Sequence, residues 1–528
     1  MKKIIQIVGL IIITMGQITC RKVDVGEVSF KDQDKFSMYS YLVAHKDTFS
    51  SFLSIVEKGG IDKILSAYNP SINGPGYTLF LPDNNAINTL IQESGKYTSL
   101  ADLLNDAAYV SALCRYHVLT AAHKTDDFPY GFFKELTLSD DQLAVNIPKD
   151  GAYFLINNQA PIVRTNIKVS NGYIHIIGKS LKPITYTTYG WLEQNSGYSI
   201  FKAAVDITGL KALLDLNIKT NTLGATPFTL LVEADSVYNK RKIYSISDLE
   251  NLVSPNNTDY TNPSNSLHSF VTYHLLIGSK GLNDFATQYN VSERNYETYS
   301  DIPLKITDLG LFCVINKGST VFDTLVHNSD TTIINYIGFN YDASNILSQS
   351  GSINNIDQVL TKVRPIQTRV DFQFLDGEPI FQKMSQVPGS HIIEDSSALK
   401  TLKWTGPDMY FVTGDNSSQA WNGDYLMINN GDFSLKYITP KIIQGTYDVW
   451  LRANGTNSQN AVIQLFIDGK PIGGLINLTT GGQSYDAFLQ RKLGTFNFSS
   501  YDQHIIEIKS LIPGRFLLDD IYFDLPTL

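Results

Sequence analysis

Adjacent carboxylates are the residues of this sequence that most readily suggest chemistry. They stand at Asp126-Asp127, Asp140-Asp141 and Asp519-Asp520. Two carboxylates on either side of a substrate can serve as a general acid and a general base. Neighbouring residues of a strand point to opposite faces, however, so an adjacent pair rarely acts on one substrate. The pairs therefore favour solvated turns over a hydrolytic site.

Other catalytic motifs do not occur in the sequence. It contains no Gly-x-Ser-x-Gly nucleophile turn and no His-Glu-x-x-His zinc motif. The segment from Gly172 to Ser180 looks like a phosphate loop, but five residues separate its glycines where that loop requires four. Its alternating apolar residues also predict a strand. We therefore expect a protein that is not an enzyme.

The N-terminus carries a targeting pattern. Lys2 and Lys3 precede the apolar stretch Ile4 to Met15. A basic start followed by a short apolar run is typical of a signal peptide, and this run is too short to cross a membrane as a permanent helix.

Cys20 follows that stretch at the distance found in bacterial lipoprotein signals, and the segment resembles a lipobox. Gln17 and Thr19 depart from the usual lipobox residues. The resemblance implies cleavage of residues 1–19, lipidation of Cys20, a tether over residues 20–35, and export to the outer membrane or the cell surface. The alternative is an ordinary signal peptide with an incidental cysteine.

Composition bounds the rest of the chain. Its 528 residues allow about three to five domains. The 42 basic and 51 acidic residues give a net charge of −9, which argues against nucleic acid as a partner. Apart from Cys20, only Cys114 and Cys313 remain, so we expect hydrophobic cores rather than disulfides to hold the fold.

Four segments punctuate the first part of the chain. Apolar residues recur at three- and four-residue steps over residues 36–65 and predict helices. A β-run from Tyr77 ends at Pro82, where Asp83 or Asn84 can cap the next helix. The pair Tyr116-His117 follows. Asn171-Gly172 then begins an alternating run, which predicts a hairpin.

In this order, the strand-to-helix turn, the Tyr-His pair and the closing Asn-Gly strand resemble the fasciclin domain. The resemblance implies a fold that mixes helices with a β-sheet, over residues 36–184. A weaker copy runs through Phe228–Val232, His268–Leu276 and Ser352–Leu360. It implies a second, degenerate fasciclin-like domain over residues 191–365.

The second copy departs from the first at two places. Glu233-Ala234 replaces the Pro-Asp pair, and Asn355 is expected at the position of His175. Residues 189–199 look like a linker. His117 and His274 lie within apolar runs. The resemblance links that region to receptor adhesion. We favour the alternative hypothesis that each is a core histidine bonded to the backbone.

The sequence pattern changes at residue 366. Residues 366–528 contain short runs in which apolar and polar residues alternate, separated by turns. Such runs occupy Tyr447–Arg452, Val462–Ile467 and Phe516–Phe523. They predict an antiparallel β-sandwich. The pattern resembles a carbohydrate-binding-module-like jelly roll of the galactose-binding type, so the expected fold is multidomain, α+β followed by all-β.

The alternation in two of these strands suggests a ligand-binding face. With Tyr447, Val449 and Leu451 turned inward, Trp450 and Arg452 face outward. By the same rule, Gln464 and Phe466 face outward, and Trp421 could form a rim. Aromatic rings with neighbouring donors are typical of a sugar site. Two alternatives remain: Trp450 and Phe466 dock the sandwich onto the preceding domain, or the register is shifted and Trp450 lies in the core.

The jelly-roll resemblance also implies a structural calcium ion, which requires six to eight oxygen ligands. The candidate ligands are Asp371, Asp519, Asp520 and Asp524. No other cofactor is expected. The sequence thus predicts a membrane-anchored, non-catalytic lipoprotein that binds a glycan or a cell-surface protein. The alternatives are a secreted polysaccharide hydrolase with unrecognised acids and a structural spacer.

Overall fold

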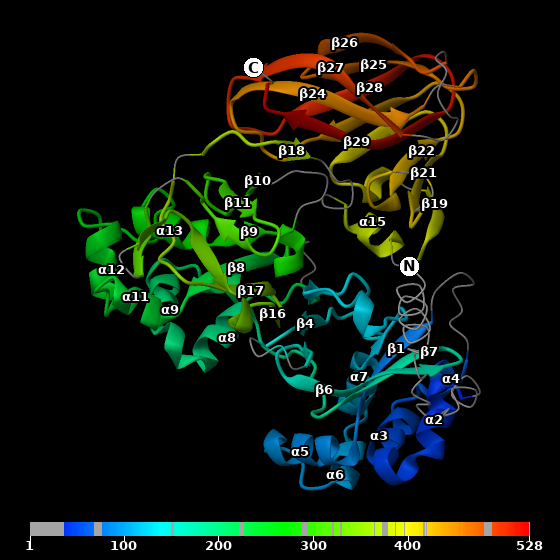
Figure 1. The fold of residues 1–528 in the computed structure, drawn as a ribbon, viewed down its shortest axis with the longest axis vertical. Coiled ribbons are helices and arrows are strands. Elements are labelled where there is room, and N and C mark those ends of the chain that lie inside the picture. Colours follow the sequence, from blue (N-terminus) through cyan, green and yellow to red (C-terminus); the bar gives the residue numbers. More distant parts are fainter. Residues whose placement is uncertain are drawn as a thin grey trace, which may run out of the picture.

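The computed structural model arranges the chain in three parts, which follow one another in sequence (Figure 1). It describes residues 36–526 except 68–75, 149–150, 152, 221–225, 287–292, 319–320, 328–329, 364, 372–377, 386, 395, 416–417, 419, 456 and 480–487. Cys20 and the predicted tether lie outside the described residues. Each part has its own clusters of buried apolar side chains.

The first unit combines helices with a seven-stranded sheet. The helices are α2 (Met38–Ala44), α3 (Lys46–Lys58), α4 (Asp62–Ser66), α5 (Asn84–Ser94), α6 (Leu100–Asn105) and α7 (Ala107–Tyr116). The strands are β1 (Tyr77–Pro82), β2 (Val118–Leu119), β3 (Gly131–Phe132), β4 (Ala144–Asn146), β5 (Leu155–Ile156), β6 (Ala160–Val169) and β7 (Gly172–Ile177). Their order is β2-β1-β7-β6-β5-β4-β3, with β1 parallel to β7. Asp83 caps α5 as predicted, because its carboxylate accepts from the Ala86 N–H at 2.7 Å.

The second unit repeats this arrangement. Its helices are α8 (Thr188–Gln194), α9 (Ser199–Ile207), α10 (Lys211–Leu214), α11 (Asp235–Lys240), α12 (Ile246–Val253) and α13 (Ser266–Tyr273). Its main strands are β8 (Phe228–Glu233), β9 (Leu275–Ile277), β10 (Glu293–Tyr296), β11 (Leu304–Asp308), β12 (Cys313–Ile315), β15 (Ile337–Asn340), β16 (Ile346–Ser348) and β17 (Gly351–Ile356). The order is β10-β11-β12-β15-β17-β8-β9, with β8 parallel to β17, and β13 (Asp323–His327) pairs with β14 (Asp330–Ile334) in a separate ribbon.

Two glycines fix the same close approach in the two units. A Cβ on Gly172 would lie 1.9 Å from the Tyr77 carbonyl oxygen, and a Cβ on Gly351 would lie 1.9 Å from that of Phe228. Their φ angles, 143° and 145°, fall in a region that L side chains rarely adopt. Each parallel pair therefore begins at a position that only glycine fills without strain.

Two threonines likewise play the same part in the two units. Thr78 Oγ1 donates to the Ala121 carbonyl oxygen at 2.7 Å, and Thr229 Oγ1 donates to that of Gly278 at 2.6 Å. Both threonine side chains are buried. The two units thus share internal bonds as well as strand order.

Two details of the expected boundaries are wrong. The segment expected to be a linker contains α8, whose Tyr189, Trp191 and Leu192 pack in the core of the second unit. Asn354, rather than Asn355, occupies the position of His175, since the second copy of the strand starts at Gly351. The closing strand of the second unit thus begins one residue earlier than the sequence predicts.

The C-terminal part consists of two antiparallel sheets and the helix α15 (Pro379–Met384). The seven-stranded sheet contains β18 (Val370–Asp371), β19 (Gly389–Ile393), β21 (Met409–Thr413), β22 (Tyr425–Ile428), β24 (Gly445–Asn454), β27 (Phe488–Phe498) and β29 (Phe516–Asp524). The five-stranded sheet contains β20 (Leu402–Thr405), β23 (Ser434–Ile438), β25 (Val462–Ile467), β26 (Lys470–Asn477) and β28 (Ile505–Ile512). Inward side chains of both sheets share one apolar cluster, so a mostly-β C-terminal part is confirmed.

Candidate functional site

The Tyr-His pair of the first unit lies in the core. His117 is fully buried at the end of α7, where its Nδ1 lies 2.7 Å from the Leu113 carbonyl oxygen and donates to it. Its Nε2 accepts from the Leu181 N–H at 3.0 Å. Burial lowers the pKa of His117 to about 4, so the ring is neutral at physiological pH. No adhesion partner can reach this side chain in the folded unit.

The second unit places a carboxylate beside the corresponding histidine. His274 Nδ1 donates to the Phe270 carbonyl oxygen at 2.7 Å, and its Nε2 lies 3.0 Å from a carboxylate oxygen of Glu233. The Tyr238 hydroxyl and the Leu360 N–H also donate to that carboxylate, at 3.0 Å and 2.6 Å. Glu233 and His274 are both fully buried.

Glu233 therefore has a structural role that the sequence comparison missed. It stands at the end of β8, where the first unit has Pro82 at the end of β1. In the first unit the Leu181 N–H is the partner of His117 Nε2. In the second unit the buried carboxylate of Glu233 is the partner of His274 Nε2. The available signal was that Glu233 replaces Pro82 while the histidine of the Tyr-His pair is kept as His274.

The predicted glycan residues do not converge. Trp450 and Arg452 lie on β24 of the seven-stranded sheet, whereas Gln464 and Phe466 lie on β25 of the five-stranded sheet. Both pairs point away from the shared core, because their neighbours along each strand are fully buried in it. The two pairs consequently occupy opposite outer faces of the C-terminal part.

Only the two aromatic residues of this set combine partial exposure with an outward position. Trp450 is partly exposed and its ring is parallel to that of Tyr522 on β29, with centroids 5.8 Å apart. Phe466 is partly exposed, with the Lys509 ammonium 5.1 Å from its ring centre. Gln464 is buried and donates to the Ile472 carbonyl oxygen at 3.0 Å. Its amide is therefore already used within the protein.

Arg452 is buried among acids. Its guanidinium lies 3.5 Å from Asp519 and 3.8 Å from Asp520. The Trp421 N–H donates to Asp519 at 3.0 Å. Burial raises the pKa of Asp519 to about 6 and that of Asp520 to about 8, and the neighbouring Asp519 contributes to the rise at Asp520. This group holds two strands together and offers no face to a sugar.

The four candidate calcium ligands are paired with arginines instead. Asp371 accepts from Arg369 at 2.9 Å, and Asp524 lies 3.7 Å from the same guanidinium. Asp519 and Asp520 face Arg452 as described. In the described part of the chain, no three His, Cys, Asp or Glu side chains are grouped so as to hold a metal ion. These residues therefore do not fit a calcium site.

Trp421 contacts the second unit. One alternative from the sequence was that Trp450 and Phe466 make this contact between the sandwich and the preceding domain. The Arg294 guanidinium, from β10, lies 5.3 Å from the Trp421 ring centre and 3.6 Å from Asp371. The amide nitrogen of Asn295 donates to Thr368 Oγ1 at 2.6 Å. Sequence reasoning missed Arg294, because nothing in its local pattern identifies a residue that crosses to another part.

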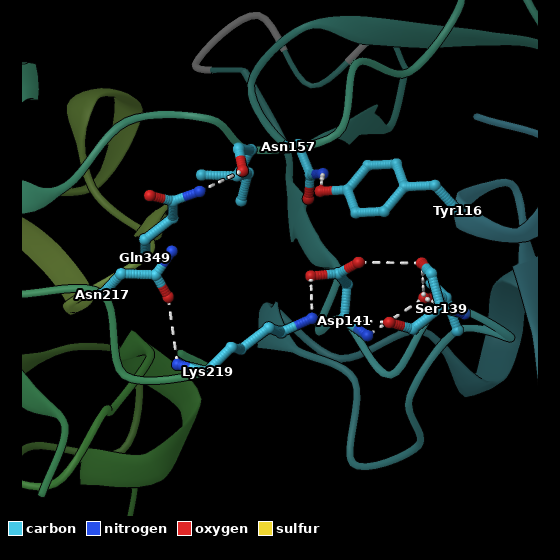
Figure 2. A network of polar contacts seen from close by, with 9 residues as sticks. Tyr116, Ser139, Asp141, Asn157, Asn217, Lys219 and Gln349 are labelled. Atoms are coloured by element: carbon cyan, nitrogen blue, oxygen red, sulfur yellow. Dashed lines mark hydrogen bonds and ion pairs between the residues drawn. The ribbon is translucent and has the colours of Figure 1, made fainter. Parts of the chain in front are cut away.

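The first and second units are joined by a polar network. Figure 2 shows Lys219 beside Asp141. Their Nζ and Oδ1 atoms lie 2.5 Å apart, and the Gln349 amide nitrogen donates to the Ile184 carbonyl oxygen at 3.2 Å. Deeper in the interface, the amide nitrogen of Asn146 donates to the Ser344 carbonyl oxygen at 3.0 Å, with both atoms buried.

One side chain imitates a neighbouring strand across the same interface. The Asn283 side chain accepts from the Phe132 N–H at 2.9 Å and donates to the Phe132 carbonyl oxygen at 3.1 Å. Phe132, Ala144 and Leu347 form an apolar cluster that spans the two units. Such paired and buried contacts favour a fixed arrangement of the two units.

Comparison with known proteins identifies the first unit. The family model described as "Fasciclin domain" matches residues 47–183. Residues 47–183 form a fasciclin domain. This confirms the prediction for the first part of the chain. Among the described residues, no helix has the length and apolar character that crossing a membrane requires.

Two curated relatives match the region of the fasciclin domain. Human Stabilin-1 is 30% identical over 145 residues, which are 27% of this chain and 5% of the relative. Transforming growth factor-beta-induced protein ig-h3 from Sus scrofa is 26% identical over 172 residues, which are 32% of this chain and 23% of the relative. The chain thus spans less than a quarter of each relative.

Solved structures show more distant likenesses. The FAS1 domain pair of the insect cell adhesion molecule fasciclin I is 18% identical, with a TM-score of 0.26, and covers 59% of this chain and 96% of its own. A family 35 carbohydrate-binding module from Clostridium thermocellum is 11% identical, with a TM-score of 0.20, and covers 30% of this chain and 98% of its own.

Proposed function

We propose that this protein is an exported surface lipoprotein that mediates adhesion without catalysis. In this account the second unit is a second fasciclin-like domain, and the C-terminal part is a jelly-roll sandwich that binds a glycan. The observation that carries the proposal is the fasciclin domain at residues 47–183, packed on a unit with the same strand order and the same internal threonine bonds. Two units joined by buried contacts suit a module that must hold a ligand-binding part at a fixed distance.

The glycan-binding face of this account is the one that carries Trp450. Its ring is partly exposed beside Tyr522, and Lys492, which contacts Asp448 at 2.7 Å, stands opposite Trp450 on β27. An aromatic ring with charged donors nearby is the mixture that sugar sites use. Phe466 provides the matched control, because it is an aromatic residue on the opposite outer face.

The experiment compares Trp450→Ala with Phe466→Ala in the full chain on a glycan array. We expect Trp450→Ala to lose at least tenfold in binding, with a melting temperature close to that of the wild type, and Phe466→Ala to bind normally. Loss of binding only in Phe466→Ala would assign the opposite face. Unchanged binding in both variants would contradict a glycan site on either aromatic residue.

The proposed anchor is tested separately at Cys20. Two or three acyl chains, each contributing about 0.8 kcal/mol per buried methylene, would hold the protein at a membrane. We expect Cys20→Ser to appear in the soluble fraction after cell breakage, whereas a Cys114→Ser control stays with the membranes. A Cys20→Ser protein that still sediments with membranes in high salt would show that the anchor is not this lipid.

A further inference from the structure

The second unit contains a cavity of about 350 Å³. It opens where the parallel strands β8 and β17 end and α11 begins. Val237, Ile356 and Ala234 provide an apolar side. Lys240 and Asp357 line it with opposite charges. Cavities of this size, mostly apolar with a few placed polar groups, are typical of small-molecule sites.

Asp357 is held in place by the neighbouring strand. Its Oδ1 accepts from the Gly338 N–H at 2.7 Å. A Cβ at Gly338 would lie 2.6 Å from Asp357 Oδ2, so the glycine leaves the space that the carboxylate occupies. Partial burial raises the pKa of Asp357, and Lys240 acts in the opposite direction. The carboxylate is therefore positioned rather than free to swing.

The fasciclin domain supplies an internal comparison. Since the two units share a frame, counting from the paired glycines places Thr89 where the second unit has Lys240. The same count places Gly178 at the position of Asp357. Both charges are thus specific to the second unit, although the backbone around them is shared. Lys240 and Asp357 are also exposed, unlike the buried Glu233, so the core of the second unit does not require them.

We propose that this cavity binds a small acidic sugar, such as one hexuronic acid unit. The Lys240 ammonium binds the ligand carboxylate, and the Asp357 carboxylate accepts from a ring hydroxyl. Asn340 and Ser236, which also line the cavity, provide further polar contacts for hydroxyls. The apolar side packs against the C–H face of the ring. The cavity lies outside the C-terminal part, so this site and the Trp450 face are independent.

The test uses the full chain with glucuronate and, as the neutral comparison, glucose. Saturation-transfer NMR should show saturable glucuronate binding that weakens at least tenfold in Lys240→Met, and glucose should bind at least tenfold more weakly than glucuronate. Lys63→Met, an exposed lysine on α4 of the fasciclin domain, is the matched control and should bind as the wild type does. Because Lys240 is exposed, we expect Lys240→Met to melt within about 2 °C of the wild type.

A second readout locates the ligand without any substitution. Amine acetylation followed by mass spectrometry should find Lys240 protected by glucuronate and Lys63 unprotected. Equal glucuronate binding by Lys240→Met and Lys63→Met would overturn the proposal. So would the absence of saturable binding by the wild type, or acetylation of Lys240 that glucuronate does not slow. None of these results depends on Trp450, so a failure here is distinct from a failure of the sandwich site.

Discussion

Buried histidines give the fasciclin domain a definite dependence on pH. His175 is fully buried on β7, where its Nδ1 accepts from the Asn166 N–H at 3.3 Å and its Nε2 donates to the His123 carbonyl oxygen at 3.0 Å. Burial lowers its pKa to about 4. As the pH falls below about 6.5, the unfolded chain binds a proton before the folded chain does. Stability is therefore lost between about pH 6.5 and pH 4.

The second unit has a side chain that does not titrate at the position of His175. Asn354 stands at the same position, and its amide oxygen accepts from the Asn345 N–H at 2.9 Å while its amide nitrogen donates to the Lys280 carbonyl oxygen at 3.1 Å. We expect His175→Asn to fold and to lose about 3 kcal/mol less stability than the wild type between pH 6.5 and pH 4. Urea unfolding at several pH values measures this. Parallel pH profiles for the two proteins would contradict the assignment.

The buried acid of the second unit yields a prediction at neutral pH. Glu233→Ala removes the carboxylate that faces His274 Nε2 and accepts from the Tyr238 hydroxyl in the core. We expect a loss of about 3–5 kcal/mol in the free energy of unfolding of the second unit. Glu193→Ala, an exposed acid on α8, should change it by less than about 0.5 kcal/mol. Similar losses in both variants, measured by urea unfolding, would show that Glu233 has no special role.

Residue patterns predicted the positions of the buried histidines better than their chemistry. His117 and His274 lie within apolar runs, and apolar neighbours four residues apart on a helix predict burial well. What satisfies each ring comes from distant parts of the chain, Leu181 in one unit and Glu233 in the other. In the sequence Glu233 therefore looks like the loss of the fasciclin turn motif. In the structure its carboxylate contacts His274 Nε2, which no backbone N–H contacts among the described residues of the second unit.

At the scale of elements, the closing strand of each unit depends on its first glycine. Gly351→Ala would bring a Cβ to within 1.9 Å of the Phe228 backbone oxygen at a φ of 145°. Since the obstacle is backbone, the strands must separate, and we expect a loss of at least about 2 kcal/mol. Gly197→Ala, which meets nothing within 4 Å, should be nearly neutral. Thermal unfolding distinguishes them, and a Gly351→Ala protein as stable as Gly197→Ala would refute the close approach.

Strand alternation predicted which side chains face the core and could not predict which strands share a sheet. Tyr447 and Val449, and likewise Ile463 and Leu465, are fully buried as expected. Period-two patterns carry that information locally. The chain crosses from one sheet to the other between β24 and β25, and no residue in that segment marks the crossing. The expected common face for Trp450 and Phe466 was therefore wrong.

We expect the first two units of the molecule to move as one body. Asn283→Ala removes both hydrogen bonds to the Phe132 backbone at the interface. We expect faster hydrogen exchange at β3 with little change in the melting of either unit, because Asn283 lies between their cores. Asn256→Ala, an exposed loop residue, is the control. Unchanged exchange at β3 would mean that the interface does not rest on this side chain.

We propose that the protein holds a glycan and does not cleave it. The most direct measurement incubates the full chain with a panel of acidic and neutral polysaccharides and records binding and new reducing ends in the same samples. We expect saturable binding of at least one polysaccharide with no reducing ends above the level without protein. Reducing ends that increase in proportion to protein concentration would contradict it, as would the absence of binding across the panel.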